Sequence, residues 1–348
     1  MVIGGGVAGL CAALRLAELG KKPLLIEGGK IPSQKICGEF FSSESWPLLR
    51  RLMVEPASIS KVNLHSVKQT ASLHLSSPAA AISHKTFDVT LANLVQSFAG
   101  EIKSETYVEK LQPKTSEKQN HLIYLKNGEV IEAKTLLIAT GRLPGLLKKS
   151  PSTPYLGFKA HFKELPVDPC LTIYLLPKAY LGIVPIEKGF FNVAGLAKID
   201  TSDPKASIEK IIQSHPDLQK ILDQTRCCFS EWLYTKVPEF GFKETPNWLD
   251  AYFIGDAALT IPPASGSGLS LAITSGKLAA EYSLKELCQE FKQMWKKRGQ
   301  KQLFWAKVLH HMMLNPFHSS FLKFINFCPL AGQQLYRLTR QTFTSSKI

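Results

Sequence analysis

The sequence predicts an α/β fold with three parts: an α/β domain assembled from separate stretches of the chain, an antiparallel β-sheet domain inserted into it, and a helical C-terminus. Three observations predict this fold. Residues 1–27 follow the order strand, glycine-rich turn, helix and strand. Residues 150–247 contain segments in which apolar and polar residues alternate, as in antiparallel strands. At residues 252–256 the buried-strand pattern of the first domain returns.

The α/β domain opens with a βαβ unit. Residues 1–3 form a short apolar strand, and a helix from Leu10 to about Leu19 ends at Gly20, a residue type common at helix C-termini. Residues 23–27 form the next buried strand. The patterns further along predict a strand pair, a helix, a hairpin with an Asn-Gly turn and another strand, at residues 62–82, 87–100, 122–128 and 135–139.

The inserted domain and the C-terminus follow. Alternation predicts strands around residues 158–162, 171–175 and 191–193, and one helix at about 204–224 interrupts them. A long helix begins near Gly268. We expect an α/β domain of residues 1–61, 83–149 and 248–290, a β-rich domain of residues 62–82 and 150–247, and a helical segment of residues 291–348. A chain that leaves a domain and returns to it is expected to bind its ligand between the two domains.

Composition excludes several classes of protein. With 45% hydrophobic and 20% charged residues the chain is globular, and no run of 18 apolar residues predicts a transmembrane helix. The seven cysteines are scattered without a CxxC pair, which argues against disulfides or a metal site and for a reducing compartment. The net charge of +14 favours anionic partners, but the sequence has no nucleic-acid-binding motif. We expect a cytoplasmic protein with no nucleic-acid partner.

The first turn contains a dinucleotide-binding motif. Gly4, Gly6 and Gly9 form the pattern GxGxxG between a strand and a helix. The first glycine permits the tight turn, the second lets the backbone approach a diphosphate, and the third lets helix and strand pack closely. Glu27 ends the next strand, where its carboxylate can accept hydrogen bonds from ribose hydroxyls.

A second nucleotide-contacting segment lies near the other end of the chain. Gly255 and Asp256 follow a strand, and Pro263, Gly266 and Gly268 precede a helix. The Asp256 carboxylate can hold sugar hydroxyls, and the helix amides can stabilise negative charge on an electron-rich ring. NAD would not need this second segment, whereas the longer FAD would. The sequence therefore predicts FAD as the cofactor.

These segments resemble those of flavoproteins with the p-hydroxybenzoate-hydroxylase fold, within them the geranylgeranyl-reductase-related branch, over residues 1 to about 285. Residues 255–268 carry the strongest match, and residues 35–40 and 180–185 are similar to further segments of that branch. The resemblance implies a Rossmann-like FAD-binding domain with an inserted antiparallel β-sheet substrate domain. It also implies that Asp256 binds ribityl or ribose hydroxyls and that Pro263 lies beside the isoalloxazine.

Gly266 and Gly268 would then line the pyrimidine end of that ring. The expected FAD contacts are Gly4, Gly6, Val7, Ala8, Gly9, Glu27, Gly28, Lys35, Val108, Thr140, Gly141, Gly255, Asp256, Pro263, Gly266, Gly268 and Leu269. We expect no metal site.

Few residues point to catalysis, because a flavin carries its own chemistry. Cys37 is the most specific catalytic candidate, as a thiol beside the flavin ring. The alternative is that Cys37 is a small buried hydrophobic residue. Tyr180 either positions a substrate or fills the β core. Glu39 is either a proton relay or an acid at a helix N-terminus. His161 lies on the polar side of its strand, which predicts a solvent-facing side chain.

The expected function is that of an FAD-dependent oxidoreductase, linked to NAD(P)H, that acts on a bulky apolar small molecule. The first hypothesis is reduction of C=C bonds in an isoprenoid, quinone or polyketide-like chain. The second is hydroxylation of a similar substrate, as in flavin monooxygenases. The third is a non-catalytic flavoprotein or lipid-binding remnant, which the intact glycines and Asp256 argue against.

Residues 291–348 combine large apolar side chains with Lys and Arg. Basic amphipathic helices of this kind can lie on anionic bilayers. They can also pack against the flavin domain as a structural cover. The first alternative predicts peripheral contact with the inner face of a membrane, and the second predicts a purely structural role.

Overall fold

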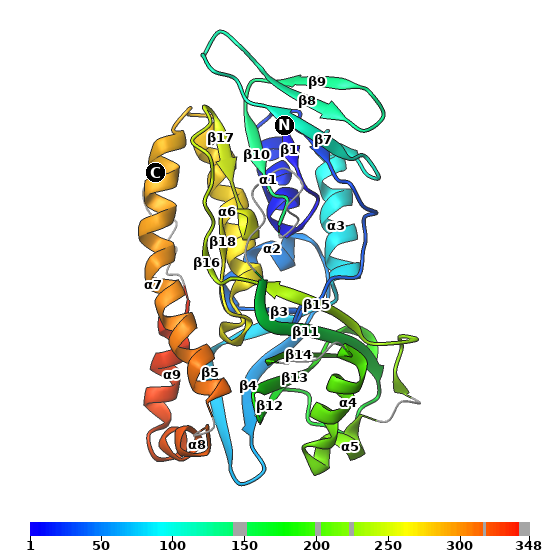
Figure 1. Ribbon diagram of the computed structural model, residues 1–348, viewed down its shortest axis with the longest axis vertical. Helices are drawn as coiled ribbons and strands as arrows, with labels where there is room; N and C mark the ends of the chain where they lie inside the picture. Colours follow the sequence, from blue (N-terminus) through cyan, green and yellow to red (C-terminus); the bar gives the residue numbers. More distant parts are fainter. Residues whose placement is uncertain (142–151, 199–202, 223–225, 316–317, 341–348) are drawn as a thin grey trace.

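The computed structural model describes residues 1–141, 152–198, 203–222, 226–315 and 318–340. A five-stranded sheet lies in the upper half of Figure 1 and an eight-stranded sheet in the lower half, and the long helix α7 (Cys288–Leu314) runs beside both. The predicted α/β class, with an inserted antiparallel sheet and a helical C-terminus, is confirmed.

The five-stranded sheet is parallel in every pair and has the order β17–β10–β1–β2–β6. Its strands are β1 (Val2–Ile3), β2 (Leu24–Ile26), β6 (Glu101–Lys103), β10 (Leu136–Ile138) and β17 (Ala251–Phe253). All residues of β1, β10 and β17 are buried, as in a parallel sheet covered on both faces. Because β17 follows the inserted domain, this sheet is completed only when the chain returns.

Helices and a small sheet cover this core. Helix α1 (Val7–Glu18) contacts both α3 (His84–Ser97) and α6 (Gly268–Ser283). A meander of β7 (Val108–Gln112), β8 (His121–Leu125) and β9 (Val130–Ala133) adds Ile123 and Leu125 to the same core, and confirms the predicted hairpin. Helix α1 begins three residues before the predicted Leu10, because the residues of the glycine motif form its first turn.

The eight-stranded sheet has the order β15–β11–β14–β13–β12–β4–β5–β3. Only its β4–β12 pair is parallel. The strands are β3 (Phe40–Phe41), β4 (Ala57–His65), β5 (Thr70–Ala81), β11 (Ser152–Lys163), β12 (Leu171–Leu176), β13 (Ala179–Pro185), β14 (Phe190–Lys198) and β15 (Leu233–Pro238). The expected boundary at 61/62 falls inside β4, and the one at 149/150 lies outside the described residues.

The single helix predicted at 204–224 is two helices, α4 (Pro204–Gln213) and α5 (Pro216–Ile221). His215 separates them with extended backbone angles, φ −131° and ψ 120°. The cause is Pro216, because a proline disfavours helical geometry in the preceding residue and lacks an amide donor. Both helices pack on one face of the eight-stranded sheet.

The C-terminal part is helical, as predicted. Helix α7 contacts β17 in the first domain and β12 and β13 in the second, while α8 (His318–Phe327) and α9 (Pro329–Leu338) pack on β5. In Figure 1, α8 and α9 lie at the lower end of the molecule, far from β7–β9. The remaining elements are α2 (Trp46–Arg51), β16 (Gly241–Phe242), β18 (Leu259–Thr260) and short 3-10 turns at 43–45, 187–189, 255–257 and 263–265.

Candidate active site

The glycine-rich turn after β1 has no room for side chains at two of its glycines. Gly4 has a φ of 105°, a region that favours glycine, and a Cβ there would overlap the carbonyl oxygen of Ala139. A Cβ on Gly9 would overlap the carbonyl of Gly4. At Gly6, the residue preceding α1, none of the described atoms lies within 4 Å of the Cβ position. Space is therefore open at the N-terminus of α1, where helix amides can hold a diphosphate.

Glu27, just after β2, faces this turn. Its carboxylate accepts hydrogen bonds from the amides of Gly5 (2.5 Å) and Gly29 (2.7 Å). Each carboxylate oxygen has a second lone pair that a ribose hydroxyl can use. Glu27 therefore fixes the loop after β2 against the glycine turn and remains the expected ribose acceptor.

The second nucleotide segment meets the first at Ala8. Gly255 has a φ of 59°, and a Cβ on it would lie 2.9 Å from the Cβ of Ala8. Gly276, in α6, would overlap the carbonyl oxygen of Ala8 if it carried a side chain. Helices α1 and α6 therefore cross in close contact, and Asp256 lies one residue from that contact.

The loop after Asp256 leads to the start of α6. Gly266 is left-handed with a φ of 61°, and the ring of Phe40 lies 3.0 Å from where its Cβ would be. Pro263 and Gly268 are exposed, so the first turn of α6 is open to a ligand. Next to the glycine turn, the Thr140 hydroxyl is buried without a hydrogen-bond partner in the described part of the chain.

These features fit FAD. The open start of α1 would bind the diphosphate, and Glu27 and Asp256 would bind the sugar hydroxyls. The exposed start of α6 would face the ring. The Thr140 hydroxyl, which is unpaired among the described residues, would hydrogen-bond to an atom of the ligand. The individual contacts stay predictions. The remaining expected residues lie in the first turns of α1 and α6 (Val7, Ala8, Leu269), after β10 (Gly141), next to Tyr107 (Gly28, Val108) and against Asp88 (Lys35).

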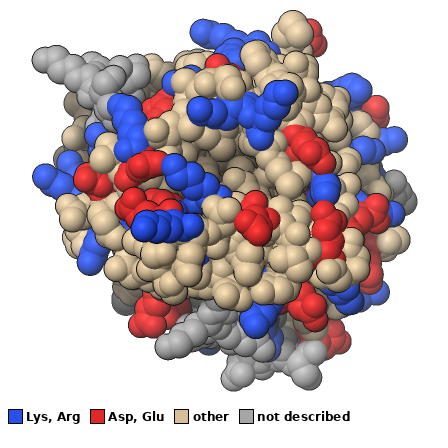
Figure 2. Space-filling model, turned by 90° about the horizontal axis from the view of Figure 1, so that it is seen from above, with Lys and Arg blue, Asp and Glu red and all other residues tan. Residues whose placement is uncertain are grey.

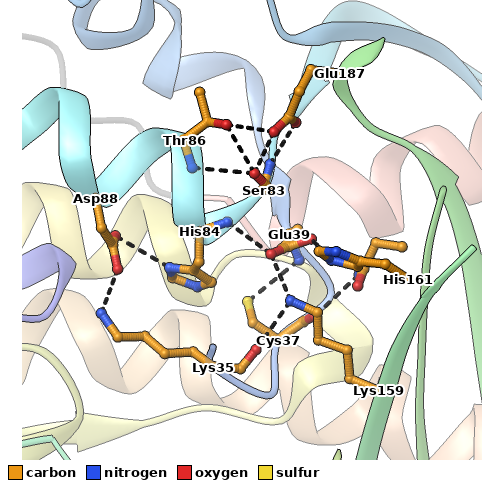
Figure 3. Close-up of polar contacts among 11 residues, drawn as sticks. Lys35, Cys37, Glu39, Ser83, His84, Thr86, Asp88, Lys159, His161 and Glu187 are labelled. Carbon is orange, nitrogen blue, oxygen red and sulfur yellow. Dashed lines mark hydrogen bonds and ion pairs between the residues drawn. The ribbon is translucent and has the colours of Figure 1, made fainter. Parts of the chain in front are cut away.

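Glu39 lies at the centre of a buried polar cluster between the two domains (Figure 3). Its carboxylate accepts hydrogen bonds from Lys159 Nζ (2.6 Å), His161 Nε2 (2.7 Å) and the backbone amide of His84 (2.7 Å). His84 is the first residue of α3, so Glu39 is an acid at a helix N-terminus. Burial opposes the ionisation of Glu39, but His161 and Lys159 outweigh burial and lower its pKa.

Cys37 lies beside the same helix end. Its Sγ accepts a hydrogen bond from the amide of Glu39 (3.4 Å), and the side chain of His84 lies near enough to lower the pKa of the thiol. His84 Nδ1 lies 3.3 Å from Asp88 Oδ1, and Asp88 Oδ2 accepts a hydrogen bond from Lys35 Nζ at 2.5 Å. Figure 3 shows the links from the His84 imidazole to Asp88 and from Asp88 to the partly exposed Lys35, with the Cys37 thiol beside them.

The charges of these side chains support one another. Burial raises the pKa of Cys37, but the hydrogen bond and positive charge of His84 hold it below its ordinary value. Burial lowers the pKa of His84, but Asp88 and Cys37 raise it to about 9. Burial raises the pKa of Asp88, and His84 with Lys35 lowers it. These shifts all favour the charged forms, with the imidazolium of His84 lying between the Cys37 thiol and the Asp88 carboxylate.

Strand β11 supplies the other side of the cluster. Its apolar residues point into the core under α4 and α5, so Lys159 and His161 point to the opposite face. The prediction of a solvent-facing His161 is wrong: the residue is 7% exposed, because residues 35–39 and α3 cover that face. Asn192 on β14 pairs with His161 across the sheet and donates from Nδ2 to the Cys37 carbonyl (3.1 Å).

Tyr180 lies in the core between the eight-stranded sheet and α7. The ring of His310 packs edge-on against Tyr180, Tyr155 and Phe240 at 6.4, 5.2 and 5.1 Å. Ala264, in the loop before α6, packs on the same cluster. Burial raises the pKa of Tyr180. Tyr180 is thus a core residue next to the loop that precedes α6.

The described residues contain no group of three His, Cys, Asp or Glu side chains arranged to hold a metal ion. None of their helices combines the length and hydropathy that crossing a bilayer requires.

Comparison with known proteins agrees with this geometry. Residues 1–164 match the family described as pyridine nucleotide-disulphide oxidoreductase. The menaquinone reductase of Mycolicibacterium smegmatis is 20% identical over 85% of this chain and 78% of its own length. The digeranylgeranylglycerophospholipid reductase of Thermoplasma volcanium is 25% identical over 81% and 77%. The solved structure of a flavin-dependent brominase superposes with a TM-score of 0.80 and 18% identity, over 97% of this chain and 92% of that one.

Proposed function

We propose that this chain, an FAD-dependent oxidoreductase with the p-hydroxybenzoate-hydroxylase fold, reduces C=C bonds of a bulky apolar substrate with NAD(P)H as the electron donor. The observation that carries the proposal is the partly buried Cys37 beside the buried pair of His84 and Asp88. It is a proton source held next to the expected ring site, since Phe40, three residues after Cys37, contacts Gly266.

Saturation of a C=C bond takes one hydride and one proton. Reduced FAD, when bound, supplies the hydride. The proton comes from the pair of Cys37 and His84: the imidazolium of His84 returns its proton to Sγ, and Sγ–H donates it to the substrate carbon, which leaves a thiolate beside a neutral imidazole. Lys159 and the amide of Glu39 stabilise that thiolate. Asp88 then favours the imidazole taking up a new proton, which restores the pair.

Hydroxylation is the alternative. A hydroxylase adds an oxygen atom to its substrate and needs no acid at a substrate carbon, so Cys37 beside His84 favours reduction. Both curated relatives are reductases, whereas the likeness to the brominase, at 18% identity, concerns the fold. The family that matches residues 1–164 is described by its pyridine nucleotides, which supports NAD(P)H as the donor.

The test is anaerobic turnover. The flavin-loaded protein is reduced with NADH or NADPH and mixed with menaquinone or with a digeranylgeranylglycerophospholipid. We expect the flavin to reoxidise without oxygen and a product heavier by two hydrogens. A product that has gained oxygen, formed only in air, would establish the hydroxylase instead.

Cys37→Ala should slow product formation about a hundredfold, the range of general acid catalysis, and leave flavin reduction by the nicotinamide unchanged. Cys228→Ala is the matched control, because Cys228 is exposed on the surface. Equal rates in the two variants would remove Cys37 from the reaction.

A further inference from the structure

The guanidinium of Arg340, just after α9, lies against the loop that precedes α6. It stacks over the ring of Tyr336 at 3.9 Å and lies 6.0 Å from the centre of the Phe40 ring. Its Nη2 lies 3.9 Å from the Cβ position of Gly266, in the loop expected to face the flavin ring. Its Nε and Nη1 are buried and have no hydrogen-bond partner among the described residues.

A buried cation with unpaired N–H groups is costly, and proteins normally pair such a group. Burial lowers the pKa of Arg340, although Tyr336 and Glu44 oppose that effect. An acceptor from a ligand would satisfy these donors. We propose that Arg340 holds an anionic group at the loop 263–268, supplied either by the reduced flavin ring or by a phosphate of the substrate.

The two sources give different results with Arg340→Gln. If the reduced flavin is the anion, the variant loses about tenfold in its preference for reduced over oxidised flavin, which lowers the midpoint potential by about 30 mV. If a substrate phosphate is the anion, the potential stays constant, and inorganic pyrophosphate binds the oxidised holoenzyme at least tenfold more weakly.

Arg340→Lys is the matched control because it keeps the charge and loses only the planar fork. It should restore most of either effect, whereas a purely structural stacking role would not distinguish Lys from Gln in this way. If Arg340→Gln changes neither the potential nor pyrophosphate binding, the proposal is wrong.

A second, independent observation concerns charge. Residues 291–348 contain ten Lys and Arg and not one Asp or Glu, so most of the net charge of +14 lies in the last sixth of the chain. Five of the ten lie at positions 292–301, in the first half of α7. Figure 2, which views the end of the molecule opposite α8 and α9, shows Lys and Arg interspersed with Asp and Glu there.

The same helices expose large apolar side chains. Phe324, Phe327 and Leu330, at the turn from α8 to α9, are 52%, 90% and 74% exposed. Next to them α7, α8 and α9 enclose an open apolar groove of about 330 Å³, lined by Trp305, Val308, Met312, Phe321, Phe324, Ile325, Ala331, Gln334, Leu335 and Leu338. Exposed Lys307, Lys323 and Arg337 come from the same three helices.

Cations around exposed apolar groups match the interface of an anionic bilayer, where each cation near the surface gains attraction and each apolar side chain leaves water. A polynucleotide would use the cations but not Phe327 or Leu330. We infer that α7–α9 dock on anionic phospholipid, with Phe327 and Leu330 inserted and one lipid chain in the groove.

The test is co-sedimentation of the flavin-loaded protein with vesicles. We expect binding to phosphatidylglycerol-containing vesicles at low ionic strength and little binding to phosphatidylcholine alone. Phe327→Ser/Leu330→Ser should lose retention on anionic vesicles, while Met53→Ser, which replaces an equally exposed side chain after α2, should not.

Charge is tested in the same way. Lys323→Gln/Arg337→Gln should weaken partitioning about thirtyfold, since each cation near the surface is worth about fivefold, and Lys21→Gln/Lys22→Gln should have much less effect. Wild-type protein that stays in the supernatant at low ionic strength would overturn the proposal. Tight binding of duplex DNA by both wild type and Phe327→Ser/Leu330→Ser, without vesicle binding, would assign the cations to a polynucleotide instead.

Discussion

Removal of the His84 imidazole by His84→Gln should raise the pKa of Cys37. The pKa of His84, about 9 against an ordinary 6.5, is a net shift of about 3 kcal/mol, left after the interactions with Asp88 and Cys37 have outweighed burial. A contribution from Cys37 of one pKa unit corresponds to about a tenfold change in the thiolate population. In the variant, burial is no longer opposed by His84, so the pKa rises.

The assay is alkylation of Cys37 by iodoacetamide as a function of pH, followed by mass spectrometry of its peptide. Wild-type reactivity should persist at a pH where that of His84→Gln has fallen about tenfold. Cys228 is an internal standard, since it is exposed on the surface. Asp88→Asn should give a smaller shift in the same direction. Superimposable profiles for wild type and His84→Gln would refute the thiol–imidazole pair.

Other outcomes follow from the same geometry. The purified protein should be yellow and release FAD, not FMN, on denaturation. Asp256→Ala should weaken FAD binding by about one to two decades while the fold persists, as measured by flavin titration. Gly9→Ala should abolish FAD binding and lower the Tm, because its Cβ would overlap the carbonyl of Gly4. Lys159→Met should cost about 3–5 kcal/mol of stability at neutral pH by leaving Glu39 buried without its cation. The lowered pKa of Glu39 stabilises the fold above pH 4.5, so this difference should shrink as the pH falls below that value.

Local patterns in the sequence predict the nucleotide-binding half of the fold well. The strand, turn and helix around Gly4 and Gly9 are neighbours in sequence, and the glycine spacing expresses a steric requirement of that turn. Pro216 is also a local signal, because a proline predicts a helix boundary at the residue before it. The prediction of one helix over residues 204–224 did not use this signal.

The polar cluster could not be predicted in this way, because its members come from four separate stretches. Alternation along β11 shows that Lys159 and His161 share a face, but it does not show what covers that face. The one signal in the sequence for a buried ion pair was the charged Lys159 between the apolar residues Phe158 and Ala160. Only the packing of residues 35–39 and α3 on the sheet turns these side chains into partners of Glu39.

The close crossing of α1 and α6 has a consequence for synthesis of the chain. Ala8 is covered by Gly255 and Gly276, and β10 gains its outer neighbour only from β17. Roughly 250 residues separate α1 from α6. A ribosome needs roughly 12–50 s to add that many. During this time the face of α1 that α6 contacts has no cover, so the first domain to begin emerging is among the last to be completed, and tight FAD binding follows the emergence of α6.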